Sequence, residues 1–439
     1  MMDAASAGTP LSASPGSPSA PRVVILALNG LEMDRRVENE ARSVSAAGFD
    51  VYRVGMRQFG DQALEERTAF DTMIRMSPEW HRPKAARAAQ APPSPEPVLV
   101  RQWSLKILAM TALRRAFPRT SRSVDRLRSL ARWNRLIVET VLPLAPAVVI
   151  ACDFNTLQAG VNLKRLTGCS LVYDAHEMWT EQYSMETMIA PAKAYARASE
   201  GRLMKRADLC VTVSRRFSSI MAQRYGVPAP LVVYSGTERC AAGISPVSRP
   251  VRVYFQGSFS RDRGLEDVVL AMRGLEGRAV LTLQGFGTLK QELEDLVARE
   301  GLADFVTFLG PCAPSDVVEA CAGHDIGIVA GRVDSMNARL TTPNRPFVYF
   351  AGGLAVVTPA ELEEIADIVS ESGSGVVFSA EGPESVRRAL LGLIDDEAAL
   401  VAAKRQSLDL CARFRWDAQF GRVVEWMRER VPEPSAGRV

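Results

Sequence analysis

The stretch VYDAHEMWTEQY, residues 172–183, concentrates side chains that could do chemistry. Two carboxylates flank His176, which is one of only three histidines in a chain of 439 residues. The stretch begins as an apolar strand, and a histidine just beyond the carboxyl end of a parallel strand can reach a ligand in a cleft. The alternative is a polar loop in which Asp174 or Glu177 caps the following helix.

The elements that must position this stretch form two blocks of alternating strands and helices. The strands are apolar on both faces, which is typical of parallel sheets covered by helices. We predict them at residues 22–30, 49–56, 147–153, 170–176, 209–214 and 231–236, and again at 251–257, 279–285, 305–310, 326–331, 354–359 and 375–379. The pattern therefore predicts an α/β chain with two tandem doubly wound Rossmann-like domains facing a central cleft, which is the default ligand site.

Composition shifts suggest the domain boundaries. A Pro/Ser/Ala/Gly-rich start is expected to be a disordered tail, and TERCAAGISPVSRP has the composition of a linker. We place the tail at 1–20, the N-terminal domain at 21–237, the linker at 238–250, the C-terminal domain at 251–413, and a final helix and tail at 414–439. The sequence FRWDAQFGRVVEWMRERV in the final segment is amphipathic, so it can bury one side.

Bulk composition excludes several classes of protein. The net charge is +3 and 47% of the residues are hydrophobic, as in ordinary soluble proteins rather than nucleic-acid-binding polycations. Seven scattered cysteines without a CxxC pair predict reduced, mostly buried thiols and no zinc site. No apolar run reaches the roughly 18 residues that span a bilayer, and the start lacks the features of a signal peptide. We therefore expect a cytoplasmic protein.

Six segments in order resemble the family 4 glycosyltransferases of the GT-B type, from about residue 22 to the C-terminus. The similar segments are DRRVENEARSVSAAGFDVYRVGM, ACDFNTLQAGVNLKRLTGCSLVYDAHEMWTEQ, ADLCVTVSRRFSSIMAQRYGVPAPLVVYSG, YFQGSFSRDRGLEDVVLAM, LQGFGTLKQELEDLVAREGLADFVTFLGPCAPSDVVEACAGHDIGIV and SMNARLTTPNRPFVYFAGGLAVVTP. A Gly-x-Gly alone is a weak signal, so the order and spacing of the segments carry the resemblance.

The resemblance implies transfer of a sugar, with retention, from a nucleotide-diphosphate donor to a glycan or lipid-linked acceptor. It implies neither a metal nor another cofactor, and it implies a role in cell-surface polysaccharide or glycolipid synthesis. Asp174, His176 and Glu177 match the Asp-Ala-His-Glu stretch that faces the family's cleft, with His176 near the transferred sugar. The family's terminal helix crosses back to the first domain, which implies the same for residues 414–439.

The resemblance also implies the donor-binding residues. Arg263 stands where the family places a diphosphate-contacting cation, at the start of a predicted helix over 264–274, and a helix N-terminus favours anions. Ser258 replaces a second arginine of the family, for which Arg261 could substitute. The other implied donor contacts are Asn29, Gly30, Gly285, Gly287, Ser335, Asn337, Asn344 and Arg345. The two glycines at 285 and 287 can instead serve only a tight strand-to-helix turn.

One departure concerns the donor ribose. The family's Pro-Asn-Lys-x-Phe-Glu-Tyr reads PNRPFVY here, so Val348 replaces the ribose-binding glutamate, and Leu340 occupies the other acidic position. Loss of a charged hydrogen bond worth about 1.5–3 kcal/mol corresponds to roughly 10- to 100-fold in affinity. Asp334, Ser335 or Glu361 could supply another acceptor. The alternative function is a non-catalytic GT-B protein that binds or regulates a partner glycosyltransferase; an epimerase would need acid/base carboxylates that the sequence does not offer.

The segment 101–135 carries ten Lys or Arg residues against a single acid, interleaved with apolar residues. This composition is typical of a surface that lies on anionic lipid headgroups at the inner face of the cell membrane. We select Trp103, Arg114, Arg115 and Trp133 as the candidate acceptor or membrane surface. The alternative is a helical pair whose apolar face packs on the sheet while its arginines stay solvated. A nucleic-acid partner is not expected, because no reading module accompanies the basic stretch.

Overall fold

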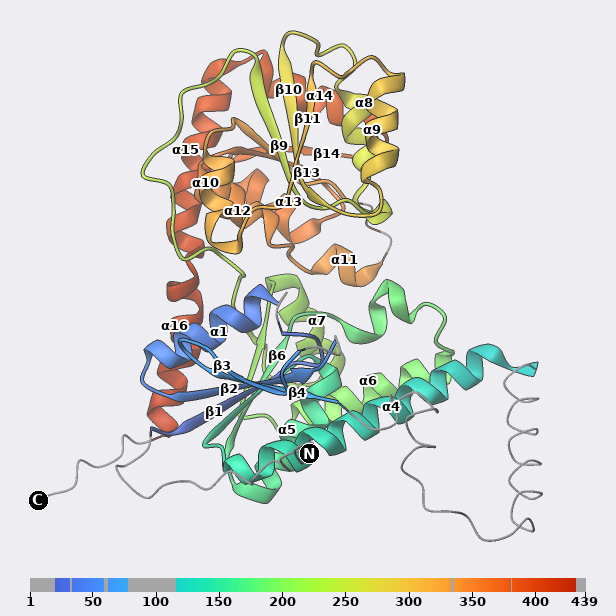
Figure 1. Ribbon diagram of the computed structural model, residues 1–439, viewed down its shortest axis with the longest axis vertical. Helices are drawn as coiled ribbons and strands as arrows, with labels where there is room; N and C mark the ends of the chain where they lie inside the picture. The colour runs from blue at the N-terminus through green and yellow to red at the C-terminus, as the bar shows by residue number, and fades with distance from the viewer. Residues whose placement is uncertain are drawn as a thin grey trace, which may run out of the picture.

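The computed structural model describes residues 20–31, 34–58, 62–77, 116–331, 333, 335–379 and 381–431. Within these ranges the chain forms two α/β domains, one above the other in Figure 1, each built on its own sheet. The predicted fold class is confirmed. Nearly all of the predicted tail, residues 1–20, lies outside the described residues.

The N-terminal sheet has the strand order β3-β4-β2-β1-β5-β6-β7-β8. Its strands are β1 (Arg22–Leu26), β2 (Asp50–Met56), β3 (Glu65–Arg67), β4 (Thr72–Met76), β5 (Val148–Cys152), β6 (Ser170–Ala175), β7 (Leu209–Thr212) and β8 (Leu231–Val232). All neighbours pair in parallel except β3 with β4. The central strands β1 and β5 are almost wholly buried. The carboxyl ends of β1, β5 and β6 therefore meet at one edge of the sheet.

Helices cover both faces of this sheet. They are α1 (Arg35–Ala46), α4 (Pro118–Val141), α5 (Phe154–Thr167), α6 (Ala190–Met204) and α7 (Arg215–Tyr225). Helix α1 begins at Arg35 because Asp34 caps it: the Asp34 carboxylate accepts the N–H of Val37 at 3.1 Å. The buried face of α1 packs on β1 and β2, which fixes the start of the helix beside the sheet edge where β1 ends.

The C-terminal sheet is wholly parallel, with the order β11-β10-β9-β12-β13-β14. Its strands are β9 (Val251–Ser258), β10 (Ala279–Phe286), β11 (Val306–Leu309), β12 (Ile326–Ile328), β13 (Ala355–Pro359) and β14 (Gly375–Phe378). Its helices are α8 (Leu265–Ala271), α9 (Lys290–Arg299), α10 (Val317–Ala322), α11 (Met336–Leu340), α12 (Arg345–Gly352), α13 (Glu363–Ser372) and α14 (Pro383–Ile394). A large apolar core lies between β9, β10 and helices α8, α9 and α14.

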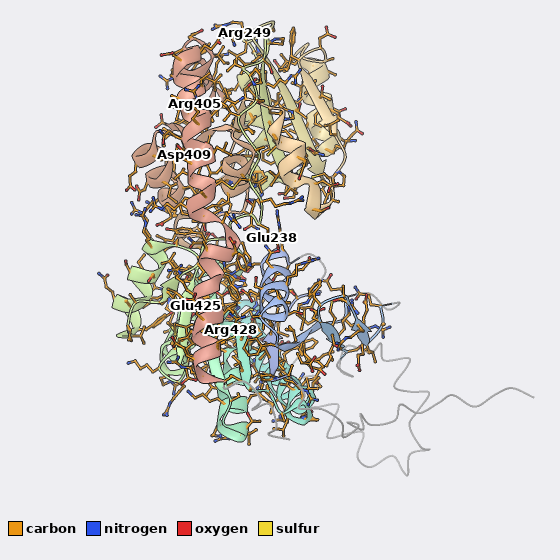
Figure 2. The ribbon with its side chains drawn as sticks, turned by 90° about the vertical axis from the view of Figure 1, so that its left-hand side faces the viewer. Glu238, Arg249, Arg405, Asp409, Glu425 and Arg428 are labelled. Atoms are coloured by element: carbon orange, nitrogen blue, oxygen red, sulfur yellow. A yellow bond between two sulfur atoms is a disulfide. The ribbon has the colours of Figure 1, made fainter. Side chains whose placement is uncertain are left out.

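Two helices at the end of the chain connect the domains. α15 (Glu397–Phe414) packs in the C-terminal domain and α16 (Trp416–Arg430) packs against α1. Figure 2 shows them as one long rod, with Arg405 and Asp409 beside the upper domain and Glu425 and Arg428 beside the lower one. The apolar face of α16 is buried with the N-terminal core. The contacts of α16 therefore join the last segment of the chain to the first domain.

Of the four residues selected as the membrane surface, the structure describes one, Trp133, and it is not on the surface. Trp133, on α4, is only 8% exposed and belongs to the core under the sheet, so selecting it as a surface residue was wrong. α4 packs against α5, and Trp133 shares one core cluster with apolar residues of α5, which explains the burial. Trp103, Arg114 and Arg115 lie outside the described residues. Among the helices of the described ranges, none combines the length and apolarity needed to cross a membrane.

The expectation that all cysteines are reduced was also wrong. Cys240, in the linker, and Cys411, on α15, form a disulfide across 171 residues. The linker runs back along this helix, which brings the two side chains together. Cys152, Cys169, Cys210, Cys312 and Cys321 are free thiols.

Candidate active site in the interdomain cleft

A cleft of about 820 Å³ lies where the two sheet edges face each other. Both domains line it. The N-terminal domain contributes the ends of β1 and β6 and the start of α1, and the C-terminal domain contributes the end of β9 and the segments around α11 and α12. A cavity of this size is in the usual range for small-molecule sites, and it lies at the carboxyl ends of parallel strands as the fold predicts.

The cleft gathers eight of the predicted site residues. From the N-terminal domain come Asn29, Gly30, His176 and Glu177, and from the C-terminal domain Arg263, Asn337, Asn344 and Arg345. These residues are up to 316 positions apart in the chain. The two sheets therefore bring the predicted sugar-contacting histidine and the predicted diphosphate-contacting arginine to one cavity.

Three further predicted residues lie off the cleft wall. Asp174 is 1% exposed, and its carboxylate forms a hydrogen bond with the His176 ring. Arg261 is exposed and forms an ion pair with Glu292 of α9 at 2.6 Å. Ser335 caps α11, where its hydroxyl accepts the N–H of Ala338. These interactions assign each side chain a structural partner in the present arrangement.

The backbone conformation explains why residues 285 and 287 are glycines. Both adopt positive φ, 152° and 155°, at the end of β10. A Cβ atom at Gly285 would collide with the carbonyl of Gly257, and one at Gly287 with the backbone of Phe259. Only glycine allows β10 to approach the end of β9 so closely. Neither glycine lines the cleft, but Gly257 does. Their effect on a bound donor would therefore be indirect, through the position of Gly257.

His176 rests on a buried ion pair. Its Nε2 lies 3.1 Å from Oδ2 of Asp174, and Arg36 donates to both oxygens of that carboxylate at 2.9–3.0 Å. Burial acts to raise the pKa of Asp174, but the Arg36 guanidinium and the His176 ring together outweigh it and hold that pKa well below its usual range. Burial acts to lower the pKa of His176, but Asp174 and Asp153 outweigh it and raise the pKa well above its usual range. The imidazole is therefore a charged hydrogen-bond donor at neutral pH.

Glu40 of α1 lies fully buried behind the same histidine, with Oε1 3.8 Å from Nε2 of His176. Burial and the charge of Asp174 raise the pKa of Glu40 to about 8. The ligand atoms of Glu40, Cys152 and His176 lie within 4.8 Å of one another, a spacing that could hold a metal ion. Arg36, however, lies 3.4 Å from Glu40 and already supplies a positive charge there, so we assign no metal to this cluster.

The protonated Glu40 predicts a specific pH dependence of stability. Its pKa is raised on folding, so its contribution is fully present below about pH 4.5 and is lost as pH rises through about 8. Glu40→Gln removes this titration. We expect the free energy of unfolding of the variant to fall less steeply between pH 5 and pH 8, by up to about 1.4 kcal/mol per pH unit. Urea unfolding at several pH values measures this slope, and parallel curves for the two proteins would contradict it.

Asp153, at the end of β5, was missed by the sequence analysis. Its backbone has φ 61° and ψ 165°, a region that is open mainly to glycine. In this conformation Oδ1 accepts the N–H groups of His176 at 2.9 Å and Glu177 at 3.2 Å. Burial raises the pKa of Asp153 to about 7, although His176 opposes the rise. Strain is thus combined with a perturbed carboxylate that fixes the backbone of the two predicted catalytic residues.

This combination predicts opposite effects on stability and activity. Asp153→Gly relieves a backbone strain of about 1–3 kcal/mol but deletes the two hydrogen bonds to the backbone of 176 and 177. Asp153→Asn keeps the strain and can keep both bonds. We therefore expect the glycine variant to lose more activity than the asparagine variant while unfolding at an equal or higher temperature. An asparagine variant that is both less active and more stable than the glycine variant would refute the assignment.

The donor side of the cleft is cationic. Arg345 lies beside Gly257, its guanidinium stacks 4.5 Å above the Phe255 ring, and its Nη1 donates to the carbonyl of Ala330 at 3.1 Å. Arg35, at the start of α1, faces the same cavity from the other domain. Burial lowers the pKa of Arg35, with Glu238 and Glu38 opposing. These cations converge on the cavity together with Arg263, an arrangement suited to a polyanion.

The position that replaces the family's ribose-binding glutamate also faces the cleft. Val348, on α12, is 5% exposed and lines the cavity. Nearby in the lining, Gln256 carries a buried carbonyl oxygen that accepts no hydrogen bond within the described residues. Its amide donates to Sγ of Cys312 at 3.0 Å, which fixes the orientation of the side chain. Gln256 was not selected from the sequence, and it lies in the cleft lining beside Val348.

Direct contacts hold the two domains in this arrangement. Asn337 of the C-terminal domain accepts the N–H of Met178 at 2.7 Å, next to the predicted catalytic residues His176 and Glu177. On α13, the buried Glu364 accepts the backbone N–H groups of Arg215 and Arg216, at 3.2 and 3.1 Å. Burial acts to raise the pKa of Glu364, but the hydroxyl of Tyr234 and these donors lower it. The cleft is therefore bordered by ordered interdomain contacts.

Comparison with known proteins adds two family matches. Residues 21–236 match the glycosyl transferase 4-like domain, and residues 250–396 match the glycosyl transferases of group 1. The two matches meet at the linker and together cover most of the chain. No curated protein sequence matches it.

Solved structures of similar fold cover nearly the whole chain. Sucrose-phosphate synthase from Thermosynechococcus elongatus has a TM-score of 0.67 at 14% identity, covering 93% of this chain and 98% of its own. The Anabaena protein HepE in complex with UDP has a TM-score of 0.63 at 13% identity, covering 93% and 100%. A trehalose-6-phosphate synthase has a TM-score of 0.61 at 13% identity, covering 94% and 100%. At such identities the likeness is one of fold.

Proposed function

Since the chain belongs to the GT-B glycosyltransferases, we propose that it transfers a sugar from a nucleotide-diphosphate donor to a glycan or lipid-linked acceptor, with retention of configuration. The observation that carries the proposal is the convergence of Arg263 and Arg345 from one domain with His176 from the other on a single cleft. The HepE structures with UDP and UDP-glucose support a nucleotide-sugar donor. The trehalose-6-phosphate synthase, studied for transfer with retention, supports the stereochemistry.

The proposed reaction breaks the bond between C1 of the sugar and the diphosphate oxygen. The acceptor oxygen forms the new bond to C1, and its proton passes to the departing diphosphate. Arg263 and Arg345 offset the charge that grows on that diphosphate. The charged His176 donates to a hydroxyl of the transferred sugar. No step calls on a metal ion, because the arginines supply the positive charge.

Gln256 is the proposed partner for the nucleoside. Its unpaired carbonyl oxygen can accept a ribose hydroxyl or a base N–H, which offsets part of what Val348 removes. The non-catalytic alternative rests on Val348 and Ser258, both in the cleft lining. We do not favour it, because both domains match transferase families and the cleft keeps its arginines.

We also propose that the acceptor belongs to cell-surface polysaccharide or glycolipid synthesis and is met at an anionic membrane surface. Support comes from the exposed arginines of α4, which are Arg119, Arg122, Arg128, Arg132 and Arg135. Basic surfaces of this kind are attracted to anionic headgroups. Sedimentation of the protein with vesicles containing phosphatidylserine, but not with phosphatidylcholine alone, checks this part of the proposal.

Thermal unfolding with UDP, GDP, dTDP and ADP and their common sugar conjugates tests the donor. A ligand present at 100 times its dissociation constant adds about 2.7 kcal/mol to the free energy of unfolding. We expect one nucleotide to raise the unfolding temperature, and its sugar conjugate to do the same. Unchanged curves across the panel would favour the non-catalytic alternative.

A further inference from the structure

A second cavity of about 280 Å³ adjoins the donor cleft within the N-terminal domain. It opens among the ends of β1, β5 and β6 and shares Asn29, Asp34, His176 and Glu177 with the larger cleft. The residues it adds include Asp153, Asn155, Trp179 and Gln182. An occupant of this cavity would touch the same histidine as the transferred sugar, so the two cavities form one continuous site.

One buried polar group of the smaller cavity has no partner within the described residues. The side-chain oxygen of Asn155 is buried and accepts no hydrogen bond within the described residues. Trp179 is only 6% exposed and gives the cavity an aromatic wall. A buried acceptor or donor left unsatisfied costs about 1–3 kcal/mol, so such groups indicate a polar ligand or ordered water. A hydroxyl of a sugar ring that lies next to Trp179 would satisfy the Asn155 oxygen.

The two cavities differ in charge. Four arginines line the larger one, which are Arg35, Arg36, Arg263 and Arg345. The smaller one is lined by the carboxylates of Asp34, Asp153 and Glu177, and its single cationic side chain among the described residues is that of His176. Asp34 and Glu177 are each bonded by an amide, from Asn29 and Gln182, which fixes the carboxylates in place. A ligand that carries a negative charge would meet repulsion here, since fixed like charges are a strong basis for rejection.

We propose that the smaller cavity binds the acceptor and selects a hydroxyl of an uncharged or amino sugar over one of a uronic acid or a sugar phosphate. The inference rests on the proposed function, because the second cavity becomes an acceptor subsite only if the first binds a donor. Hydroxyls of the acceptor ring donate to Asp153, Glu177 and the Asn155 oxygen, and the ring edge lies against Trp179. An ammonium group gains attraction from the same carboxylates.

Binding of matched methyl glycosides tests the selection directly. The probes are gluco, galacto and manno series, each in neutral, 2-amino and 6-carboxylate form, titrated by saturation-transfer NMR with the protein saturated in its nucleotide. In at least one series we expect the neutral and amino forms to bind at least about 10-fold more tightly than the carboxylate, since like-charge contacts cost several kcal/mol. A carboxylate form that binds as tightly as its neutral match overturns the proposal, as does the absence of binding by every neutral and amino form.

One pair of variants separates charge from shape. Asn155→Asp is nearly isosteric and adds a fourth carboxylate, so the ratio of amino-form to carboxylate-form affinity is expected to rise. Arg261→Ala changes charge by the same amount outside both cavities and is expected to leave the ratio unchanged. Equal ratios in the two variants overturn the proposal. If the nucleotides still raise the unfolding temperature while the sugars fail, the acceptor inference alone is lost; if both fail, the proposed function is lost too.

Discussion

Replacement of Arg345 by alanine is expected to lower the rate of sugar transfer by about 10²–10³-fold, the usual effect of removing one group that stabilises charge in a transition state. The charge of the leaving diphosphate grows during the reaction, so the loss should appear mainly in kcat/KM for the donor. Arg345 is held for this task by the Phe255 ring and the Ala330 carbonyl. Kinetics with the donor found in the thermal screen measure the effect.

Arg261 provides the matched control. It is an arginine of the same domain, yet it pairs with Glu292 outside the cleft. Arg261→Ala is therefore expected to change transfer by less than about threefold, the effect of an exposed ion pair worth under 1 kcal/mol. Because Arg345 also packs on Phe255, the unfolding temperature of each variant must be measured alongside. If the two variants were equally active and equally stable, the diphosphate assignment of Arg345 would be wrong.

Replacement of Asp174 by alanine is expected to destabilise the N-terminal domain by about 3–5 kcal/mol, because it leaves the Arg36 charge buried without its partner. Both side chains are buried, with their closest atoms 2.9 Å apart. Arg36 also donates to the carbonyl of Val233 at 2.8 Å and to Ser235 at 3.2 Å. The loss should therefore loosen the chain where it leaves the sheet for the linker. Urea unfolding measures it.

Glu40 is expected to limit the loss of stability caused by Asp174→Ala. With Asp174 gone, Glu40 can ionise and take over Arg36, whose Nε lies 3.4 Å away. The double variant Asp174→Ala, Glu40→Gln removes that rescue, so its loss should exceed the sum of the two single losses. Glu38→Ala on the same helix breaks only the exposed pair with Arg42 and should cost about 0.3–0.5 kcal/mol. A single Asp174→Ala loss as small as that of Glu38→Ala would show that the buried pair is not needed.

The sheets could be predicted because their central strands are continuous apolar runs. β3 and β4 lack such apolar runs, so the sequence did not predict them. β3 is a three-residue strand, Glu-Glu-Arg, exposed throughout, and no pattern of hydrophobic residues marks it. β4 places Arg75 inside the protein, where Glu66 of β3 pairs with it at 2.7 Å. Charged residues that pair across an edge are invisible to a hydrophobic pattern.

The place of His176 and Arg263 in the cleft lining could be predicted because a strand end and a motif point to them. Asp153 was missed because nothing in the sequence shows that an aspartate adopts positive φ. The Cys240–Cys411 disulfide was missed because its partners lie 171 residues apart and pair only through the path of the linker. Trp133 was misplaced because a basic amphipathic segment has the same composition whether its apolar face meets lipid or the sheet.

The most direct test of the account is the release of nucleoside diphosphate from UDP-, GDP-, dTDP- and ADP-sugars by the purified chain, with and without a neutral sugar acceptor. The account predicts release from the sugars of one nucleotide, faster with the acceptor and strongly reduced in Arg345→Ala. It also predicts that Arg261→Ala releases the nucleotide at the rate of the unchanged protein. Absence of release across the panel from a folded protein would contradict a catalytic cleft and leave the partner-binding alternative.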